Sequence, residues 1–302
     1  MKKLLLWMLI FLPAGAIAPG GQGDPVAQWT ALTAANSGFY ANLVYKVANN
    51  YECKLDVITP GSLSKVRPVF IYYHGGGWIS GTKEEVTLYT LPYLAQGMDV
   101  VNVEYRLAKV SLAPAAVEDA RSALHWVYTH ARQYGFDLDR VVVSGGSAGG
   151  HLCLMAGMLT PEAGFDNEFA GQDKINLKVA AIVNSRGPTD LVAMIDEPTP
   201  PWFLLNWFGS LPNQRELAKR LSPITYVRPG LPPVFTMHGD ADEYVPYQQQ
   251  AVRLHEALTR AGVPNQLHTI PGGKHGGFTP EQVLAQQQAA IDFLKQYGIL
   301  PR

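Results

Sequence analysis

The chain has 302 residues, 47% of them hydrophobic and 16% charged, which is enough apolar material for a large core and excludes a disordered chain. The formal net charge is −1, and the Lys and Arg residues are spread along the sequence. A nucleic-acid partner is therefore not expected, because phosphate neutralisation requires a basic face.

The first residues have the pattern of a secretory signal peptide. Two lysines precede an apolar run from Leu4 to Leu12, and small residues follow up to Ala18. The run is shorter than the roughly 20 residues of a membrane-spanning helix, although an uncleaved membrane anchor is the alternative. We expect residues 1–18 to be a signal peptide, the protein to be secreted or periplasmic without stable membrane association, and residues 19–302 to form a single domain.

Strand-like runs rich in β-branched residues alternate with helix-like stretches along the rest of the chain. Several strand-like runs are continuously apolar, as in strands that helices cover on both faces. The alternation predicts an α/β fold with a mainly parallel central sheet and helices on both faces. Two early runs, 40–46 and 51–59, are expected to add an antiparallel edge. The other expected strands are 54–59, 69–73, 99–104, 140–144, 179–184, 234–238 and 266–270, and the expected helices are 84–96, 114–134, 148–159, 247–261 and 280–296.

Residues 187–229 interrupt this alternation with seven prolines and several aromatic residues. We expect a small insertion that lies over the functional site at the carboxyl ends of the strands. Connections of this length are uncommon without a role, which favours the insertion. The alternative is an ordinary long connection whose aromatic residues pack on the core.

The strongest motif lies between an expected strand and an expected helix. The run from Arg140 to Ser144 leads directly into Gly145-x-Ser147-x-Gly149. This context is typical of a nucleophile elbow, a tight strand-to-helix turn that exposes a serine. Flanking glycines permit the close backbone approach that such a turn needs. We expect Ser147 to be a nucleophile; the alternative is a glycine-rich turn with a bystander serine.

A second glycine-rich motif, His74-Gly-Gly-Gly-Trp78, directly follows an expected strand. It resembles the HGGG-type motif of esterases and lipases. Backbone N–H groups without neighbouring side chains can bind an oxyanion, so Gly76, Gly77 and Ala148 are the expected oxyanion hole. A phosphate-binding loop is the alternative, but the Lys and Ser or Thr of a P-loop are missing.

A serine nucleophile requires a base and an orienting acid, which follow it in the α/β-hydrolase order Ser, acid, His. Three carboxylates, Asp240, Asp242 and Glu243, lie in a loop after an expected strand, and only one is needed. A solvated acidic turn is the alternative. His275 lies in a glycine-rich loop after the next strand and is the expected base, which would take the proton of Ser147.

Five motifs occur in order along the chain: Leu55-Asp-Val-Ile-Thr-Pro60, His74-Gly-Gly-Gly-Trp78, Glu104-Tyr-Arg-Leu107, Ser147-Ala-Gly-Gly-His-Leu152 and Asn184-Ser-Arg-Gly-Pro-Thr-Asp-Leu191. Together they resemble the α/β-hydrolase esterases, and their combination is similar to the bifunctional feruloyl and acetyl xylan esterase group. Hormone-sensitive-lipase-like esterases are close relatives, but they usually have Asp where this chain has Gly146. The resemblance implies an α/β-hydrolase catalytic domain, and its HGxxDxxVP pattern implies Asp242 as the acid, with Asp240 as the alternative.

The resemblance further implies removal of acetyl or feruloyl groups from a plant polysaccharide such as xylan, through an acyl-enzyme on Ser147. Trp78, Trp202 and Trp207 are candidate surfaces for sugar or feruloyl rings, unless they belong to the core. A small ester or polysaccharide-derived substrate is the expected partner, with no metal and no organic cofactor. The alternatives are a general carboxylesterase, an arylformamidase-like amide hydrolase and a noncatalytic binding scaffold.

Cysteine is scarce in this sequence. Only Cys53 and Cys153 are present, too few for a disulfide-dependent scaffold. Both lie in expected regular elements, so we expect buried small apolar side chains, with a single disulfide as the alternative.

Overall fold

The computed structural model describes residues 37–169 and 175–302. The compact unit to which they belong spans Asn36–Arg302. The signal peptide expected over residues 1–18 lies outside the described residues. Among the helices described, none has the length and apolar character needed to cross a bilayer.

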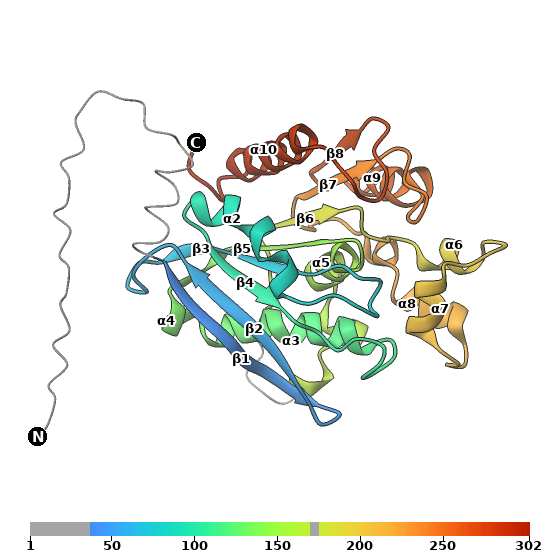
Figure 1. The fold of residues 1–302 in the computed structure, drawn as a ribbon, viewed down its shortest axis with the longest axis horizontal. Coiled ribbons are helices and arrows are strands. Elements are labelled where there is room, and N and C mark those ends of the chain that lie inside the picture. Colours follow the sequence, from blue (N-terminus) through green and yellow to red (C-terminus); the bar gives the residue numbers. More distant parts are fainter. Residues whose placement is uncertain (1–36, 170–174) are drawn as a thin grey trace, which may run out of the picture. The chain divides into compact units, whose positions relative to one another are not determined.

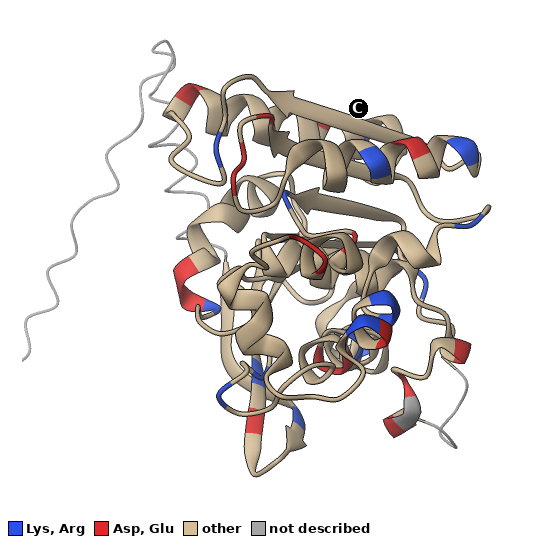
Figure 2. Cartoon of the chain, turned by 90° about the vertical axis from the view of Figure 1, so that its right-hand side faces the viewer, with Lys and Arg blue, Asp and Glu red and all other residues tan. Residues whose placement is uncertain are grey.

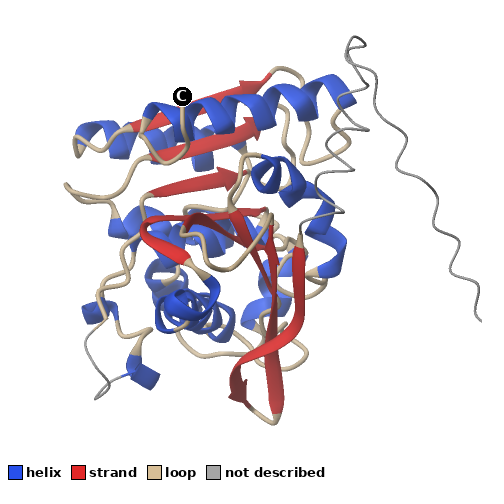
Figure 3. Ribbon diagram, turned by 90° about the vertical axis from the view of Figure 1, so that its left-hand side faces the viewer, coloured by secondary structure: helices blue, strands red, loops and turns tan. Residues whose placement is uncertain are grey.

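An eight-stranded sheet forms the centre of this unit (Figure 1). Its spatial order is β1-β2-β4-β3-β5-β6-β7-β8. The strands β3 to β8 are parallel to one another, whereas β1 and β2 form an edge in which β1 is antiparallel to β2 and β2 is antiparallel to β4 (Figure 3). The α/β-hydrolase fold expected from the sequence is confirmed, including the antiparallel edge. The strands are β1 (Gly38–Ala48), β2 (Tyr51–Thr59), β3 (Arg67–Tyr73), β4 (Asp99–Val103), β5 (Phe136–Gly146), β6 (Ala181–Ser185), β7 (Val234–Gly239) and β8 (Asn265–Ile270).

Helices connect the parallel strands and pack on both faces of the sheet (Figures 1 and 3). The α-helices are α2 (Thr87–Ala95), α3 (Ala115–Thr129), α4 (Ala131–Tyr134), α5 (Ala148–Met158), α6 (Leu191–Ile195), α7 (Trp202–Phe208), α8 (Gln214–Arg220), α9 (Arg253–Arg260) and α10 (Pro280–Gln296). Short turns of other helical types are η1 (Glu84–Val86), η2 (Pro161–Ala163), η3 (Asn167–Phe169), η4 (Pro223–Tyr226) and the π-helical η5 (Gln248–Val252).

The core has two parts, one on each face of the sheet. In β3, Ile71 belongs to the part that includes side chains of α3, α5 and α9, whereas Phe70 belongs to the part beneath α2 and α10. In β5, Val143 belongs to the first of these parts and Val142 belongs to the second. Consecutive strand residues point to opposite faces, so a continuous apolar run supplies both parts at once.

Helix α10 shows how a local sequence sets an element boundary near the site. The Thr279 hydroxyl accepts the N–H of Gln282 at 3.3 Å, and the Gln282 side chain accepts the N–H of Thr279 at 2.9 Å. Pro280 occupies the first turn, where a missing N–H costs nothing. This capping box begins the helix at Pro280, five residues after His275, and so ends the loop that carries the histidine.

The segment between β6 and β7 contains the insertion expected over residues 187–229. It folds into α6, α7, α8 and η4. Asp190 caps α6 by accepting the N–H of Ala193 at 3.0 Å. The insertion contributes Trp202 and Phe203 of α7 to the wall of the site described below.

Candidate active site

Ser147 occupies a strained turn between β5 and α5. Its backbone has φ 55° and ψ −121°, a conformation rarely adopted by a residue with a side chain. A Cβ added to Gly149 would lie 1.9 Å from the Tyr73 carbonyl oxygen, so only glycine fits there. The Ser147 N–H donates to the Ser185 carbonyl at 2.9 Å. Together these contacts fix the serine at the end of β5 and expose its side chain to the pocket.

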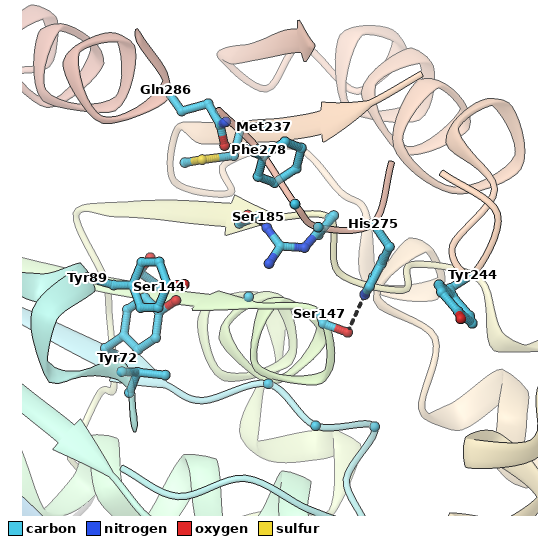
Figure 4. A pocket seen from close by; sticks show the side chains of 18 of the residues that line it. Tyr72, Tyr89, Ser144, Ser147, Ser185, Met237, Tyr244, His275, Phe278 and Gln286 are labelled. Carbon is cyan, nitrogen blue, oxygen red and sulfur yellow. Dashed lines mark hydrogen bonds between the residues drawn. The ribbon is translucent and has the colours of Figure 1, made fainter. Parts of the chain in front are cut away.

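A hydrogen-bonded chain of three side chains begins at this serine. The Oγ of Ser147 lies 2.9 Å from Nε2 of His275 (Figure 4), and Nδ1 of His275 lies 2.7 Å from Oδ2 of Asp242. A carboxylate accepts only, so Nδ1 carries the hydrogen and Nε2 is free to accept the serine proton. The three side chains come from loops after β5, β7 and β8, which meet at the carboxyl edge of the sheet.

Asp242 is buried and accepts hydrogen bonds on both carboxylate oxygens. Its Oδ1 accepts the N–H groups of Tyr244 and Val245, each at 2.9 Å. Burial alone would raise the pKa of Asp242, but the hydrogen bonds from His238 and His275 outweigh it and hold this pKa well below its usual range. The alternative acid, Asp240, is exposed and accepts the N–H of Gly272 at 2.7 Å instead.

A second histidine, which sequence analysis did not single out, also contacts the acid. The Nε2 of His238 lies 3.0 Å from Oδ2 of Asp242 and 2.9 Å from the Val245 carbonyl oxygen. Both neighbours are acceptors, so Nε2 carries the hydrogen and is shared between them. Oδ2 of Asp242 therefore receives N–H groups from two imidazoles. The available signal in the sequence was the first position of the HGxxDxxVP pattern, which His238 occupies four residues before Asp242.

The glycine-rich loop after β3 lies beside the serine. Gly76 and Gly77 have φ values of 113° and 61° and line the same pocket as Ser147. A Cβ on Gly77 would lie 2.8 Å from the Cβ of Phe203, so the loop packs closely against α7. Ala148 begins α5, and the N–H groups of a helical first turn have no carbonyl partner within the helix. The expected oxyanion-hole residues therefore lie around the serine on two backbone segments.

His74 at the start of this loop is a structural residue. Burial lowers the pKa of His74 to about 4, so its imidazole is neutral at pH 7. Its Nδ1 donates to the Gly75 carbonyl at 2.7 Å, and its ring stacks on Tyr105 with 4.3 Å between ring centroids. The Tyr105 hydroxyl donates to the His74 carbonyl at 2.9 Å. These contacts hold the beginning of the loop in place without a charge.

The side chains open onto a cavity of about 550 Å³. This volume is typical of a small-molecule site. Tyr244 lies on the His275 side of Ser147, while Tyr72, Tyr89, Met237 and Phe278 lie on the other side (Figure 4). Most of the wall is aromatic or aliphatic, and a few polar groups line it.

The structure corrects the assignment of two of the three expected substrate-binding tryptophans. Trp78 and Trp207 are fully buried and stack on each other, with ring centroids 4.2 Å apart. His151 packs edge-on against both rings, and its Nε2 donates to the Leu221 carbonyl at 2.7 Å. These residues join the insertion to α5. Trp202 is 62% exposed and lines the cavity, so it alone of the three is placed to contact substrate.

Acidic and basic residues are interspersed over the face shown in Figure 2. No three His, Cys, Asp or Glu side chains within the described ranges are arranged to hold a metal ion. Cys53 and Cys153 are both buried free thiols, as the sequence predicted.

Comparisons with known proteins agree with this geometry. The BD-FAE family model matches residues 55–258. The chain is 31% identical over 192 residues to the probable carboxylic ester hydrolase LipM of Mycobacterium tuberculosis, covering 62% of this chain and 44% of the relative. It is 29% identical over 215 residues to carboxylesterase NlhH of the same species, covering 69% and 66%. The chain thus spans less than two thirds of either relative.

Among solved structures, Thermogutta terrifontis esterase 2 is similar over nearly its whole length. Its paraoxon-phosphorylated form superposes with a TM-score of 0.74 and 28% identity, covering 88% of this chain and 96% of the esterase. The propionate-bound form gives a TM-score of 0.74 and 29% identity with the same coverage. Because the family model matches more than half of the chain and the fold is that of the α/β-hydrolase esterases, this protein belongs to the BD-FAE family.

Proposed function

We propose that this protein is a serine carboxylic ester hydrolase that removes acetyl or feruloyl groups from a plant polysaccharide such as xylan. The observation that carries the ester-hydrolase part is the hydrogen-bonded chain from Ser147 through His275 to Asp242 on a strained elbow. Such a chain activates a hydroxyl as a nucleophile.

The reaction starts with the attack of Ser147 Oγ on the ester carbonyl carbon while Nε2 of His275 takes the hydroxyl proton. The N–H groups of Gly76, Gly77 and Ala148 stabilise the tetrahedral oxyanion. His275 then returns the proton to the leaving alcohol, which leaves an acyl group on Ser147. Water, deprotonated by the same imidazole, attacks this acyl-enzyme and releases the carboxylic acid. Asp242 holds the tautomer of His275 and stabilises the imidazolium.

The polysaccharide part of the proposal draws on the sequence motifs and on the cavity. The match to the BD-FAE family supports it, as does Trp202, whose exposed indole at the cavity rim offers a flat apolar surface for a sugar or feruloyl ring. The signal-peptide pattern at the N-terminus supports action outside the cytoplasm. The names of the similar mycobacterial proteins favour a general carboxylesterase as the second candidate.

Release of acetate from acetylated xylan, compared with hydrolysis of methyl ferulate and of 4-nitrophenyl acetate, tests the proposal. Acetate or ferulate release at rates near that of the model ester supports side-chain removal from polysaccharide. Activity on 4-nitrophenyl acetate alone means a general carboxylesterase. The Ser147→Ala variant should lose turnover by roughly 10⁴-fold or more. Ser64→Ala, in the exposed turn before β3, is the matched control and should retain full turnover.

A further inference from the structure

Of the described residues that line the cavity, Arg186 is the one with a charged side chain. It directly follows β6. Its Nη1 donates to the Ser185 hydroxyl at 2.8 Å, and its guanidinium carbon lies 5.3 Å from the centre of the Phe278 ring. Its Nε is buried and has no hydrogen-bond partner, and no carboxylate of the described residues forms an ion pair with its guanidinium. Asp242 attracts this guanidinium only at longer range. A guanidinium stays protonated in such surroundings, so the cavity contains a positive charge without an ion-pair partner.

The buried arginines among the described residues each contact a carboxylate, whereas Arg186, which is half-buried, contacts none. Arg106 forms a bidentate contact with Asp119 at 2.8 Å and 2.7 Å. Arg121 contacts Asp166 through two nitrogens. Burying a charge without a partner is costly, so proteins ordinarily pair buried charges. An unpaired one that faces an open cavity indicates that the missing partner is supplied by a ligand.

The guanidinium lies close to the nucleophile and on a rigid support. A Cβ built on Gly146, the residue before Ser147, would lie 3.9 Å from Nη2 of Arg186 and 3.4 Å from the Tyr72 hydroxyl. The backbone N–H of Arg186 donates to the Met237 carbonyl at 2.9 Å, and its φ is 46°. The neighbouring carbonyl of Ser185 accepts the N–H of Ser147. The positions of the charge and the nucleophile are therefore fixed relative to each other through the sheet.

Further unsatisfied donors lie in the same part of the cavity. The Gln286 side chain is 5% exposed, lines the cavity, and its Nε2 has no hydrogen-bond partner. Tyr72, Ser185, Phe278 and Gln286 all lie on the side of Ser147 away from Tyr244 (Figure 4). None of the described residues that line the cavity is an Asp or a Glu. Hydrogen-bond donors and a cation in a cavity wall without a carboxylate are complementary to a carboxylate on the ligand.

We propose that this cavity binds esters that carry a carboxylate, with Arg186 as the counter-ion and Gln286 as a second hydrogen-bond donor. The inference rests on the proposed ester hydrolysis and names the substrate class for that site. The carboxylate has two possible sources: the acyl group, as in a hemiester of a dicarboxylic acid, or the alcohol, as in an acylated uronic acid. Arginine suits either, because its planar fork binds carboxylates bidentately.

The test compares kcat/KM for matched charged and neutral esters. For the acyl source, 4-nitrophenyl hydrogen succinate is paired with 4-nitrophenyl 4-oxopentanoate, in which a methyl ketone replaces the carboxylate. For the alcohol source, acetylated methyl glucuronide is paired with acetylated methyl glucoside. In the pair that matches the true source of the carboxylate, kcat/KM of the native protein should be higher for the charged ester by about 10-fold to 100-fold. This is the usual effect of a charge-assisted hydrogen bond. Arg186→Gln should abolish this preference, and Arg186→Lys should retain part of it.

Two further variants separate the charge from other effects. Gly146→Asp places a carboxylate beside the guanidinium and should reduce the charged-to-neutral ratio below one, whereas Gly146→Ala adds the Cβ without the charge and should retain the preference. The compared quantity is the ratio of kcat/KM for the charged ester to kcat/KM for the neutral ester. A substitution that lowers turnover equally on both esters leaves this ratio unchanged. Arg260→Gln, which removes a charge that is 69% exposed on α9, should leave the ratio unchanged.

Two results would overturn the inference: a native ratio at or below one in both pairs, or a preference that survives Arg186→Gln. If the native protein hydrolyses none of the four esters, the ester-hydrolase proposal fails instead. Calorimetric binding of the charged and neutral esters to Ser147→Ala then decides the question without turnover. The inference requires tighter binding of a charged ester, lost when Arg186→Gln is added.

Discussion

At the scale of single residues, Asp242 receives four hydrogen bonds: two backbone N–H groups on Oδ1 and two imidazole N–H groups on Oδ2. The pKa of Asp242 therefore lies below its usual range, despite the opposing effect of burial. The carboxylate is therefore ionised at neutral and mildly acidic pH. A loss of activity toward acid pH would then reflect protonation of other groups, because Asp242 loses its charge only below its ordinary value near 3.8.

Replacing the two loop aspartates separately tests this assignment. Asp242→Asn should lower kcat by about 10⁴-fold, because an amide favours the wrong tautomer of His275. Asp240→Asn should change kcat by less than about 3-fold, since its contact is an exposed hydrogen bond to Gly272. Steady-state kinetics with 4-nitrophenyl acetate measures both. Equal losses in the two variants, or a larger one for Asp240→Asn, would assign the orienting role elsewhere.

Candidate roles that a local motif sets could be assigned from the sequence, whereas roles set by spatial neighbours could not. Ser147 is flagged by glycines two positions away on either side, and His275 by its glycine-rich loop. His238 and Arg186 also lie within motifs, but those motifs assign no role to either residue. Their significance depends on Asp242 lying within 3.0 Å of one and on the absence of a described carboxylate partner for the other, which only the folded chain reveals.

At the scale of elements, helix α7 determines one wall of the site. Its seven residues place Trp207 in the core beside Trp78 and present Trp202 to the cavity. Phe203 packs on Gly77, so the helix also positions the glycine-rich loop. The same helix therefore links the insertion to both binding and the expected oxyanion hole.

The two tryptophans of α7 provide a matched pair of substitutions. Trp202→Ala should raise KM for aryl esters by about 10-fold and leave the unfolding free energy within roughly 0.5 kcal/mol, since the indole is 62% exposed. Trp207→Ala should lower the unfolding free energy by about 3–5 kcal/mol, because it removes a fully buried ring. Urea unfolding and esterase kinetics measure the two effects. A large stability loss for Trp202→Ala would argue against its contact with substrate.

Element prediction worked where the periodic pattern was long. Seven expected strands match β2 to β8 within a few residues, since continuous β-branched runs between glycines indicate buried parallel strands. The helix expected over 114–134 is divided into α3 and α4, with His130 between them. The helices of the insertion have five to seven residues, too few for a recognisable period, so their positions could not be predicted.

At the scale of the whole folded unit, core side chains cover both faces of the sheet. A few carboxylates are buried together with them. Asp99 at the start of β4 is fully buried, and its Oδ1 lies 3.7 Å from Nη1 of Arg67. Burial raises the pKa of Asp99 from 3.8 to about 6, against the opposing attraction of Arg67. The folded state therefore binds this proton more tightly than the unfolded chain does.

The sign of the resulting pH effect is fixed by linkage. Stability associated with this proton is fully present below about pH 4 and is lost as pH rises through about 6. Asp99→Asn should remove that dependence and raise the unfolding free energy at pH 8 by roughly 1–3 kcal/mol. Urea unfolding of both proteins from pH 4 to pH 8 measures it. A variant with an unchanged pH dependence, or one less stable at pH 8, would contradict the assignment.

The nucleophile and its base are 128 positions apart in the chain. Between them lie β6, the insertion, β7 and β8, so the hydrogen bond that activates Ser147 forms only when the parallel strands have assembled across that distance. Closing so long a loop is slow compared with helix formation. A chain that has formed only its local structure is therefore catalytically silent, and the onset of ester hydrolysis during refolding marks the completion of the sheet.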